Sequence, residues 1–430
     1  MHKPKAAVPW RRATRFRFRI VVIAIVFTLS LWYLVGRLQS QSQRLAPVEI
    51  ARRYPLVWEH IGTSNQTGGA WYIPPSWLGS EQPPQTIVEA ARLASSAAMS
   101  RPERQLPFSS IPFIIHQTYK TTEVEKWSAQ LFPFVEHWLT YAAKPREADE
   151  MAYFLWDDQG ISGVMRDLEA DFASSFKLFS RIEQTDIFRI IACKWFGGIY
   201  ADMDTEPLRP PQNWIGLSDL SAWVDPVSGE KHGLDIKQAV SSSKSPPVSL
   251  IGGVEADLDP DTDTYWRMGY SYPVQLTQWA LASAPQHHVL ESFMTQLRTL
   301  ANDAVADAKK SGKKLTSLEK AYAVERTGPV AFTNAVRSYL EMKVGLRWNS
   351  LTGREDNGKV KLVADVLILP ITGFSPGRQK IMGSKPIDDV EARLNHHFFG
   401  SWRHFNVAAE SGKLCRTLFG MCKDWSMADS

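Results

Sequence analysis

The chain of 430 residues contains only three cysteines, Cys193, Cys415 and Cys422. This number is too small for a disulfide scaffold, and the spacing lacks the cysteine pairs of a zinc site. Cys415 and Cys422 could bridge a C-terminal loop in an oxidising compartment, whereas Cys193 lies in an apolar helical pattern. The sequence leaves open whether this bridge forms.

Acidic residues are almost missing from the start of the chain. The first 53 residues contain one, Glu49, against eleven lysines and arginines, and they carry a net charge of +10. The whole chain has a net charge of +4, so the remaining residues carry −6. A protein that binds a nucleic acid backbone spreads basic residues over its folded domain. This distribution argues against nucleic acid as a partner.

Charges are absent from residues 20–36, IVVIAIVFTLSLWYLVG, which follow seven lysines and arginines. A helix that rises ~1.5 Å per residue would span roughly 25 Å here, the short end of what a bilayer core requires. Residues 1–19 are then a cytosolic basic tail, and 20–36 are a type II signal anchor with a lumenal remainder. The alternative is a cleaved signal peptide, but bulky residues end the run where small ones are expected.

Sustained hydrophobic periodicity is weak in residues 37–110, which contain eight prolines. This composition predicts a lumenal stem, although Trp58, Trp71 and Trp77 indicate that parts of it pack. Asn65 begins an N-x-T sequon and is a possible N-glycan site. The folded domain is expected to occupy residues 111–430.

Strand and helix patterns alternate after residue 110. Short apolar runs that end in polar residues predict buried strands, and apolar residues near helical spacing predict helices. The predicted strands cover 111–119, 151–158 and 199–201, and the predicted helices cover 124–142 and 182–196. This order predicts an α/β fold with a mostly parallel sheet flanked by helices.

Asp202 and Asp204 follow the strand at 199–201 in a D-x-D pattern. In extended geometry both carboxylates point to one side, where they repel each other unless a cation lies between them. A hard divalent ion fits, because it prefers oxygen ligands and can bridge to nucleotide phosphates. Asp186 and Arg189 share one face of the preceding helix, and Gly197-Gly198 allows the turn that brings this face close. The alternatives are a solvated acidic pair and a simple intrahelical ion pair.

Several ordered motifs resemble glycosyltransferase family 32, and the chain is most similar to the fungal initiation-specific alpha-1,6-mannosyltransferases within it. The motifs are I-P-x-I-I-H-Q-T at 111–118, Y-x-L-W-D-D at 153–158, D-x-x-R at 186–189, G-G-x-Y-x-D-x-D at 197–204, G-x-E-A-D at 253–257, Q-x-x-Q-W at 275–279, T-G-P at 327–329 and H-H-F-x-G-S-W at 396–402. The resemblance covers about 111–404. It implies a GT-A-type, Rossmann-like fold with a nucleotide-sugar site.

In similar enzymes the end of the first strand lies beside the nucleoside, the D-x-x-R residues contact the donor sugar and phosphates, and the D-x-D residues hold the metal and ribose. The donor-binding residues implied here are His116, Gln117, Thr118, Asp186, Arg189, Gly198, Tyr200, Asp202 and Trp402. Asp202, Asp204 and Arg189 are the implied catalytic residues.

A late histidine completes the metal shell in similar enzymes, and this chain offers His396 and His397. Both remain candidates, with His397 preferred, and Mn²⁺ or Mg²⁺ is the expected ion. The candidate acceptor residues are Glu255, Asp257, Gln278 and Trp279.

The resemblance therefore implies a metal-dependent retaining enzyme that transfers mannose from GDP-mannose to an N-glycan core in alpha-1,6 linkage. We expect it to be a single-pass type II protein of the Golgi membrane and a candidate member of a mannosyltransferase complex. A mannosyltransferase that acts on inositol phosphorylceramide is one alternative. A catalytically silent lumenal scaffold that binds glycans is the other.

Overall fold

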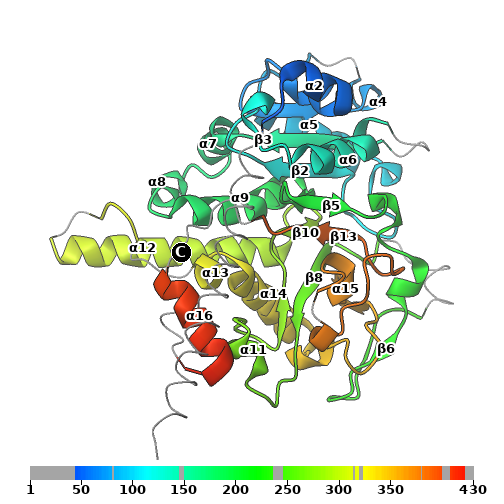
Figure 1. The fold of residues 1–430 in the computed structure, drawn as a ribbon, viewed down its shortest axis with the longest axis vertical. Helices are drawn as coiled ribbons and strands as arrows, with labels where there is room; N and C mark the ends of the chain where they lie inside the picture. The colour runs from blue at the N-terminus through cyan, green and yellow to red at the C-terminus, as the bar shows by residue number, and fades with distance from the viewer. Residues whose placement is uncertain are drawn as a thin grey trace, which may run out of the picture.

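The structure is a computed structural model that describes residues 44–79, 82–144, 150–235, 246–312, 315–318, 323–378, 380–399 and 407–421. Figure 1 shows a central sheet with helices packed around it and with α12 projecting to one side. The predicted anchor at 20–36 lies outside the described residues. Within the described ranges, no helix has both the length and the apolar character needed to cross a membrane.

The strands are β1 Gly69–Tyr72, β2 Ile114–Thr118, β3 Ala152–Trp156, β4 Gly198–Ala201, β5 Thr205–Pro207, β6 Trp223–Val224, β7 Lys231–His232, β8 Leu250–Asp257, β9 Val274–Leu276, β10 Ala280–Ser283, β11 Lys361–Val363, β12 Val366–Leu369 and β13 Leu394–His396. The α-helices are α2 Pro47–Arg53, α3 Pro55–Val57, α4 Pro75–Leu78, α5 Ile87–Met99, α6 Phe132–Ala143, α7 Asp158–Asp167, α8 Ala173–Phe176, α9 Arg181–Phe196, α11 Thr264–Arg267, α12 His288–Lys310, α13 Ala323–Arg326, α14 Pro329–Val344, α15 Ile371–Phe374 and α16 Val407–Phe419.

The main sheet is mixed, with the order β1-β3-β2-β4-β10-β8-β12-β11 and with β9 paired to β8. Strands β3, β2 and β4 are parallel, as predicted, and so are β8 and β12. The prediction of a mostly parallel sheet is wrong, because the other neighbouring strands run antiparallel. A short connection explains one of these pairs, because only residues 364–365 separate β11 from β12, and so short a loop can join only antiparallel strands. The others pair segments that lie further apart in the sequence.

The N-terminal segment forms part of the folded domain. β1 pairs with β3, and Ile50, Leu56 and Ala90 are buried in the main core. The boundary predicted at residue 111 is therefore too late, because residues from about 47 onward pack against the sheet. The many prolines interrupt the hydrophobic periodicity, so this packing could not be predicted from the pattern, although the tryptophans had indicated it.

The cysteines and the sequon have distinct environments. Cys193 is buried and has a free thiol. Cys415 is disulfide-bonded, and Cys422 lies outside the described residues. Asn65 is exposed, so its sequon is accessible and N-glycosylation there stays a prediction.

A polar cluster centred on Asp365 links two strands to two helices. Its carboxylate accepts hydrogen bonds from the Ser249 and Tyr339 hydroxyls and lies 3.2 Å from His287 Nε2. Burial raises the pKa of Asp365, but these partners outweigh burial and hold the pKa well below its ordinary value. The ionised form is therefore favoured in the folded protein.

We expect Asp365→Ala to lower the free energy of unfolding by about 2–3 kcal/mol at pH 7, because hydrogen bonds to a charged group are lost. A carboxylate with a depressed folded pKa stabilises the protein above the unfolded pKa, which is about 4, and loses this contribution as the pH falls. Urea unfolding of both proteins at pH 7 and pH 3 tests this, with exposed Asp303→Ala as the control. An equal difference at both pH values would contradict it.

Candidate active site

Asp202, Asp204 and His396 form a group whose ligand atoms all lie within 4.8 Å of one another. We call it the Asp-Asp-His group. His396 Nε2 lies 3.0 Å from Asp204 Oδ1, and all three side chains are partly buried. Two carboxylates and an imidazole suit Mn²⁺, which binds oxygen and accepts nitrogen ligands. His396 Nδ1 is buried without a hydrogen-bond partner among the described residues, so this group is not a completed internal network.

A turn, and not an extended strand, brings the two aspartates together. The Thr205 backbone N–H and its hydroxyl both donate to Asp202 O, at 3.1 and 2.6 Å. The chain therefore bends between β4 and β5, and the expectation of extended geometry at the D-x-D pattern is wrong. The bend aims both carboxylates at one place, where their mutual repulsion favours a bound cation.

Strand β13 delivers the histidine by pairing antiparallel with β5, with His396 opposite Thr205. The next residues close around Asp204, because the Phe399 backbone N–H donates to Asp204 Oδ2 at 2.9 Å. Burial raises the pKa of Asp204, but His396 and this N–H lower it below its ordinary value overall. Asp204 is thus ionised and ready to bind a cation.

His397 does not belong to the group. Its Nε2 lies 3.1 Å from Glu206 Oε2, and its ring stacks on Phe134 with 4.2 Å between the ring centres. Neighbouring residues of a strand point to opposite faces, so only one of the two histidines can face Asp204. The structure therefore brings His396, and not the preferred His397, to the two aspartates.

A buried arginine, Arg189, lies beside the Asp-Asp-His group. Arg189 Nη2 is 3.3 Å from Asp186 Oδ1 and 3.3 Å from Asp202 Oδ1, and its guanidinium lies over the Tyr200 ring. Burial lowers the pKa of Arg189, but Asp202 and Asp186 together raise it above its ordinary value. Burial raises the pKa of Asp186 to about 6. The predicted intrahelical ion pair and the predicted approach to Asp202 are both present.

Helix α9 holds Asp186 and Arg189 rigidly. It begins with a capping box between Ser180 and Glu183, and most of its residues are buried. It ends at Gly197, where φ is +66°, and a Cβ atom on Gly198 would lie 2.5 Å from Ile114 O. Glycines are therefore required for the sharp turn from α9 into β4 and for the close approach of β4 to β2.

Residues at the end of β2 orient Asp202 through hydrogen bonds. Thr118 Oγ1 lies 3.1 Å from the Tyr200 hydroxyl, which donates to Asp202 Oδ1 at 3.0 Å. Gln117 Nε2 donates to Asp202 O at 3.2 Å. These predicted donor-binding residues do meet at the site, where the contacts that the structure shows orient Asp202.

His116 has no access to the site. It is fully buried, its Nδ1 accepts from Trp156 Nε1 at 3.1 Å, and its Nε2 donates to Gly197 O at 2.9 Å. Burial lowers the pKa of His116 to about 4, so the ring is neutral. Its contacts brace the turn at Gly197, and the structure gives no support for the predicted contact with the nucleoside.

The four candidate acceptor residues divide into two kinds. Trp279 packs against His396, with 4.4 Å between ring centres, and the buried Glu255 accepts from Gln275 Nε2 at 2.9 Å. Burial raises the pKa of Glu255, while the charge of His396 acts on it in the opposite direction, so it lies beside the group. Asp257 instead accepts from Thr352 Oγ1 and Gly353 N at 2.6 and 2.7 Å, which fixes a loop.

Gln278 is fully buried behind the site. Its Oε1 accepts from Arg189 Nη1 at 3.4 Å, and its Nε2 donates to Thr327 O at 2.6 Å. Thr327 Oγ1 in turn donates to Asp186 Oδ2 at 3.0 Å. Thr327 had no predicted role at the site, although the T-G-P motif marked its position. Trp402 lies outside the described residues.

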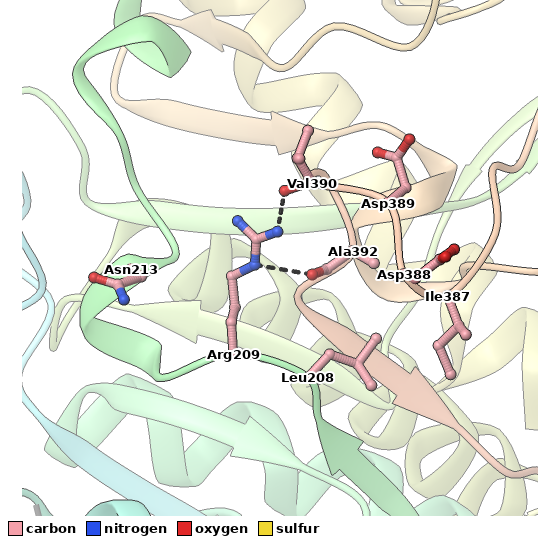
Figure 2. A pocket seen from close by; sticks show the side chains of 8 residues that line it. All are labelled: Leu208, Arg209, Asn213, Ile387, Asp388, Asp389, Val390 and Ala392. Atoms are coloured by element: carbon pink, nitrogen blue, oxygen red, sulfur yellow. Dashed lines mark hydrogen bonds between the residues drawn. The ribbon is translucent and has the colours of Figure 1, made fainter. Parts of the chain in front are cut away.

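A pocket of about 350 Å³ lies elsewhere, beside Arg209 (Figure 2). Arg209 donates from Nε to Ala392 O at 2.9 Å and from Nη2 to Val390 O, which ties the chain after β5 to the chain before β13. Because Asp204 precedes β5 and His396 ends β13, the pocket and the Asp-Asp-His group are at opposite ends of this two-stranded ribbon. The pocket is therefore separate from the predicted donor site.

Comparison with known proteins agrees with this geometry. A family model described as "Glycosyltransferase sugar-binding region containing DXD motif" matches residues 115–220, which include Asp186, Arg189, Asp202 and Asp204. Residues 115–220 thus match this sugar-binding region, in agreement with the resemblance of the chain to glycosyltransferase family 32.

The relatives found are fungal. The initiation-specific alpha-1,6-mannosyltransferase of Schizosaccharomyces pombe is 36% identical over 222 residues, which cover 51% of this chain and 46% of that protein. The matched part thus spans about half the length of this relative. The protein of the same name from Candida albicans is 24% identical over 417 residues, which cover 90% of this chain and 94% of that protein. Among solved structures, PaToxG glycosyltransferase gives a TM-score of 0.28 at 13% identity and covers 60% of this chain and 78% of that one.

Proposed function

We propose that this protein is a glycosyltransferase that transfers mannose from GDP-mannose to an N-glycan in alpha-1,6 linkage, with retention of configuration and with Mn²⁺ or Mg²⁺. The observation that carries the proposal is the Asp-Asp-His group beside the buried Arg189. The names of the fungal relatives support the choice of sugar and linkage. We also propose that the fold is of the GT-A type and that the protein lies in the Golgi membrane, with the N-terminal anchor in type II orientation.

The residues of the site suit a reaction that is limited by departure of an anionic leaving group. A divalent ion held there would neutralise charge on the departing diphosphate. Asp202 and Asp204 would hold it in place, and the hydrogen bonds from Tyr200 and Phe399 N keep both carboxylates oriented. Arg189 is positioned by Asp186 and Gln278 toward the same place, so its charge is preorganised and does not need to move during transfer.

The full-length protein should add a hexose to a high-mannose N-glycan when it is given GDP-mannose and Mn²⁺. Mass analysis of the glycan detects the addition, and digestion with linkage-specific mannosidases identifies the bond. Parallel reactions with UDP-glucose, UDP-galactose and GDP-fucose establish donor choice, and chelation of the metal should stop the reaction. Absence of a hexose increment with GDP-mannose, while another donor reacts, would overturn the proposed donor.

A further inference from the structure

Arg378 is the outermost member of a stack that ends at the Asp-Asp-His group. Its guanidinium carbon lies 3.7 Å from the centre of the Phe398 ring, and the Phe398 ring lies 3.7 Å from that of His396. Phe398 has a φ of +51°, a backbone conformation that is rare for an aromatic residue. Trp279 contacts both rings, so the position of Phe398 is well determined.

The charge of Arg378 has no close partner. Within the described parts of the chain, it forms no ion pair and no hydrogen bond. Its positive charge nevertheless acts on the buried Glu255 and the partly buried Tyr270, and it opposes the rise that burial causes in the pKa of each. Arg189 differs, because two aspartates already neutralise its charge.

When a donor is bound, its negative charge requires one more positively charged side chain at the site. Asp186, Asp202 and Asp204 together balance Arg189 and a divalent ion. A nucleoside diphosphate sugar then brings two further negative charges that this arrangement does not neutralise. A guanidinium suits them, because its planar fork donates two parallel hydrogen bonds to phosphate oxygens.

We propose that Arg378 binds the diphosphate of the nucleotide sugar, so that Arg378, Phe398 and His396 form an anion subsite next to the metal. This inference rests on the proposed function and deepens it. Phe398 separates Arg378 from His396 and positions the guanidinium by cation-π contact.

The loop that carries Arg378 is anchored at its base. The Gly377 backbone N–H donates to Lys385 O at 2.7 Å, and Ser384 Oγ donates to Ser375 O at 2.7 Å. The Lys385 backbone N–H donates to Thr372 Oγ1 at 3.0 Å, which joins the loop to α15. These bonds involve no part of the Arg378 side chain, so replacing that side chain should leave the loop folded.

The test compares Arg378→Met, Arg378→Lys and the control Arg347→Gln, an exposed arginine that follows α14. Calorimetric titration of the full-length protein with GDP in Mn²⁺ measures the affinity. We expect Arg378→Met to bind GDP about tenfold more weakly, the loss expected for one charge-assisted contact. Arg378→Lys should recover part of this loss, and the control should match the unaltered protein. Thermal unfolding checks that all three variants fold.

Two readouts separate an anion contact from a structural role. The KM for the donor should rise about tenfold in Arg378→Met while the KM for the glycan acceptor stays constant, because only the donor carries phosphate. The affinity of Arg378→Met for GDP should also fall less steeply with salt. GDP binding within twofold of the unaltered protein, or an equal loss in the lysine variant, would overturn the inference.

Failure of the proposed function has a different outcome. If the unaltered protein binds UDP instead of GDP, the proposed donor is wrong, and the same variants then test Arg378 with UDP. If GDP binds normally and Arg378→Met has no effect, the proposed function survives and the anion subsite does not. If neither nucleotide binds with Mn²⁺, both are overturned.

Discussion

Asp204→Ala is expected to lower mannose transfer at least about 10³-fold, because a bound metal supplies several kcal/mol of charge stabilisation in the transition state. Both carboxylate oxygens of Asp204 are in use: Oδ1 contacts His396, and Oδ2 accepts a hydrogen bond from the Phe399 N–H. Its loss therefore removes a metal ligand and releases the backbone that brings His396 into place. Transfer of radiolabelled mannose to a high-mannose glycan measures the effect.

Asp202→Ala should be similarly inactive but less stable. Asp202 is an ion-pair partner of the buried Arg189, and its loss leaves that cation with Asp186 alone. Removing one partner of a buried ion pair lowers the free energy of unfolding by several kcal/mol. Thermal unfolding should therefore rank Asp202→Ala below Asp204→Ala.

Asp261→Ala is the matched control, because this exposed aspartate lies in an acidic stretch remote in sequence from the group. It should keep full activity and stability. Full activity of either Asp202→Ala or Asp204→Ala in buffer that contains manganese would contradict the assignment of the metal site. An inactive and unfolded Asp204→Ala would require Asp204→Asn, which keeps the hydrogen bond from Phe399 N but loses the charge.

The parts of the site that are local in sequence could be predicted from the sequence. Asp186 and Arg189 lie in α9, and Asp202 and Asp204 lie in the turn after the next strand, β4, so their spacing already indicates proximity. The connecting glycines 197–198 could also be predicted, because only glycine allows so sharp a reversal at the end of a helix. The helix α9 lies within one residue of its predicted start.

The choice between His396 and His397 could not be predicted in the same way. It depends on the register of β13 against β5, which are almost two hundred residues apart in the chain. A shift of one residue in this register would exchange the two histidines between the faces of the ribbon. Neither the spacing nor the residue type determines that register, so only the three-dimensional pairing identifies which histidine faces Asp204.

The antiparallel pairs of the sheet could not be predicted for a related reason. Strands β8 to β12 lie in a region where short apolar segments alternate with loops, and pairing between distant segments decides their direction. The buried polar contacts of Gln278 and Thr327 arise there too, because they connect β10's preceding loop to the start of α14. Single-sequence patterns describe local structure and do not reveal such long-range partners.

The adjacent histidines allow the sharpest test of the metal centre. We expect His396→Ala to weaken Mn²⁺ binding about 100-fold or more, since removal of even an outer partner of a metal ligand costs 10- to 100-fold. His397→Ala should keep Mn²⁺ affinity within about threefold, because its ring contacts Glu206 and Phe134 and not the group. Activity measured against Mn²⁺ concentration gives both values.

The two variants also distinguish loss of metal from loss of structure. Because His396→Ala removes a ligand but leaves Asp202 and Asp204, its activity should recover in part at high Mn²⁺. A variant that fails only because β13 is disrupted would not recover in this way, and its thermal unfolding midpoint would fall. The opposite ranking, with His397→Ala more dependent on Mn²⁺ than His396→Ala, would mean that β13 pairs with β5 in a register shifted by one residue.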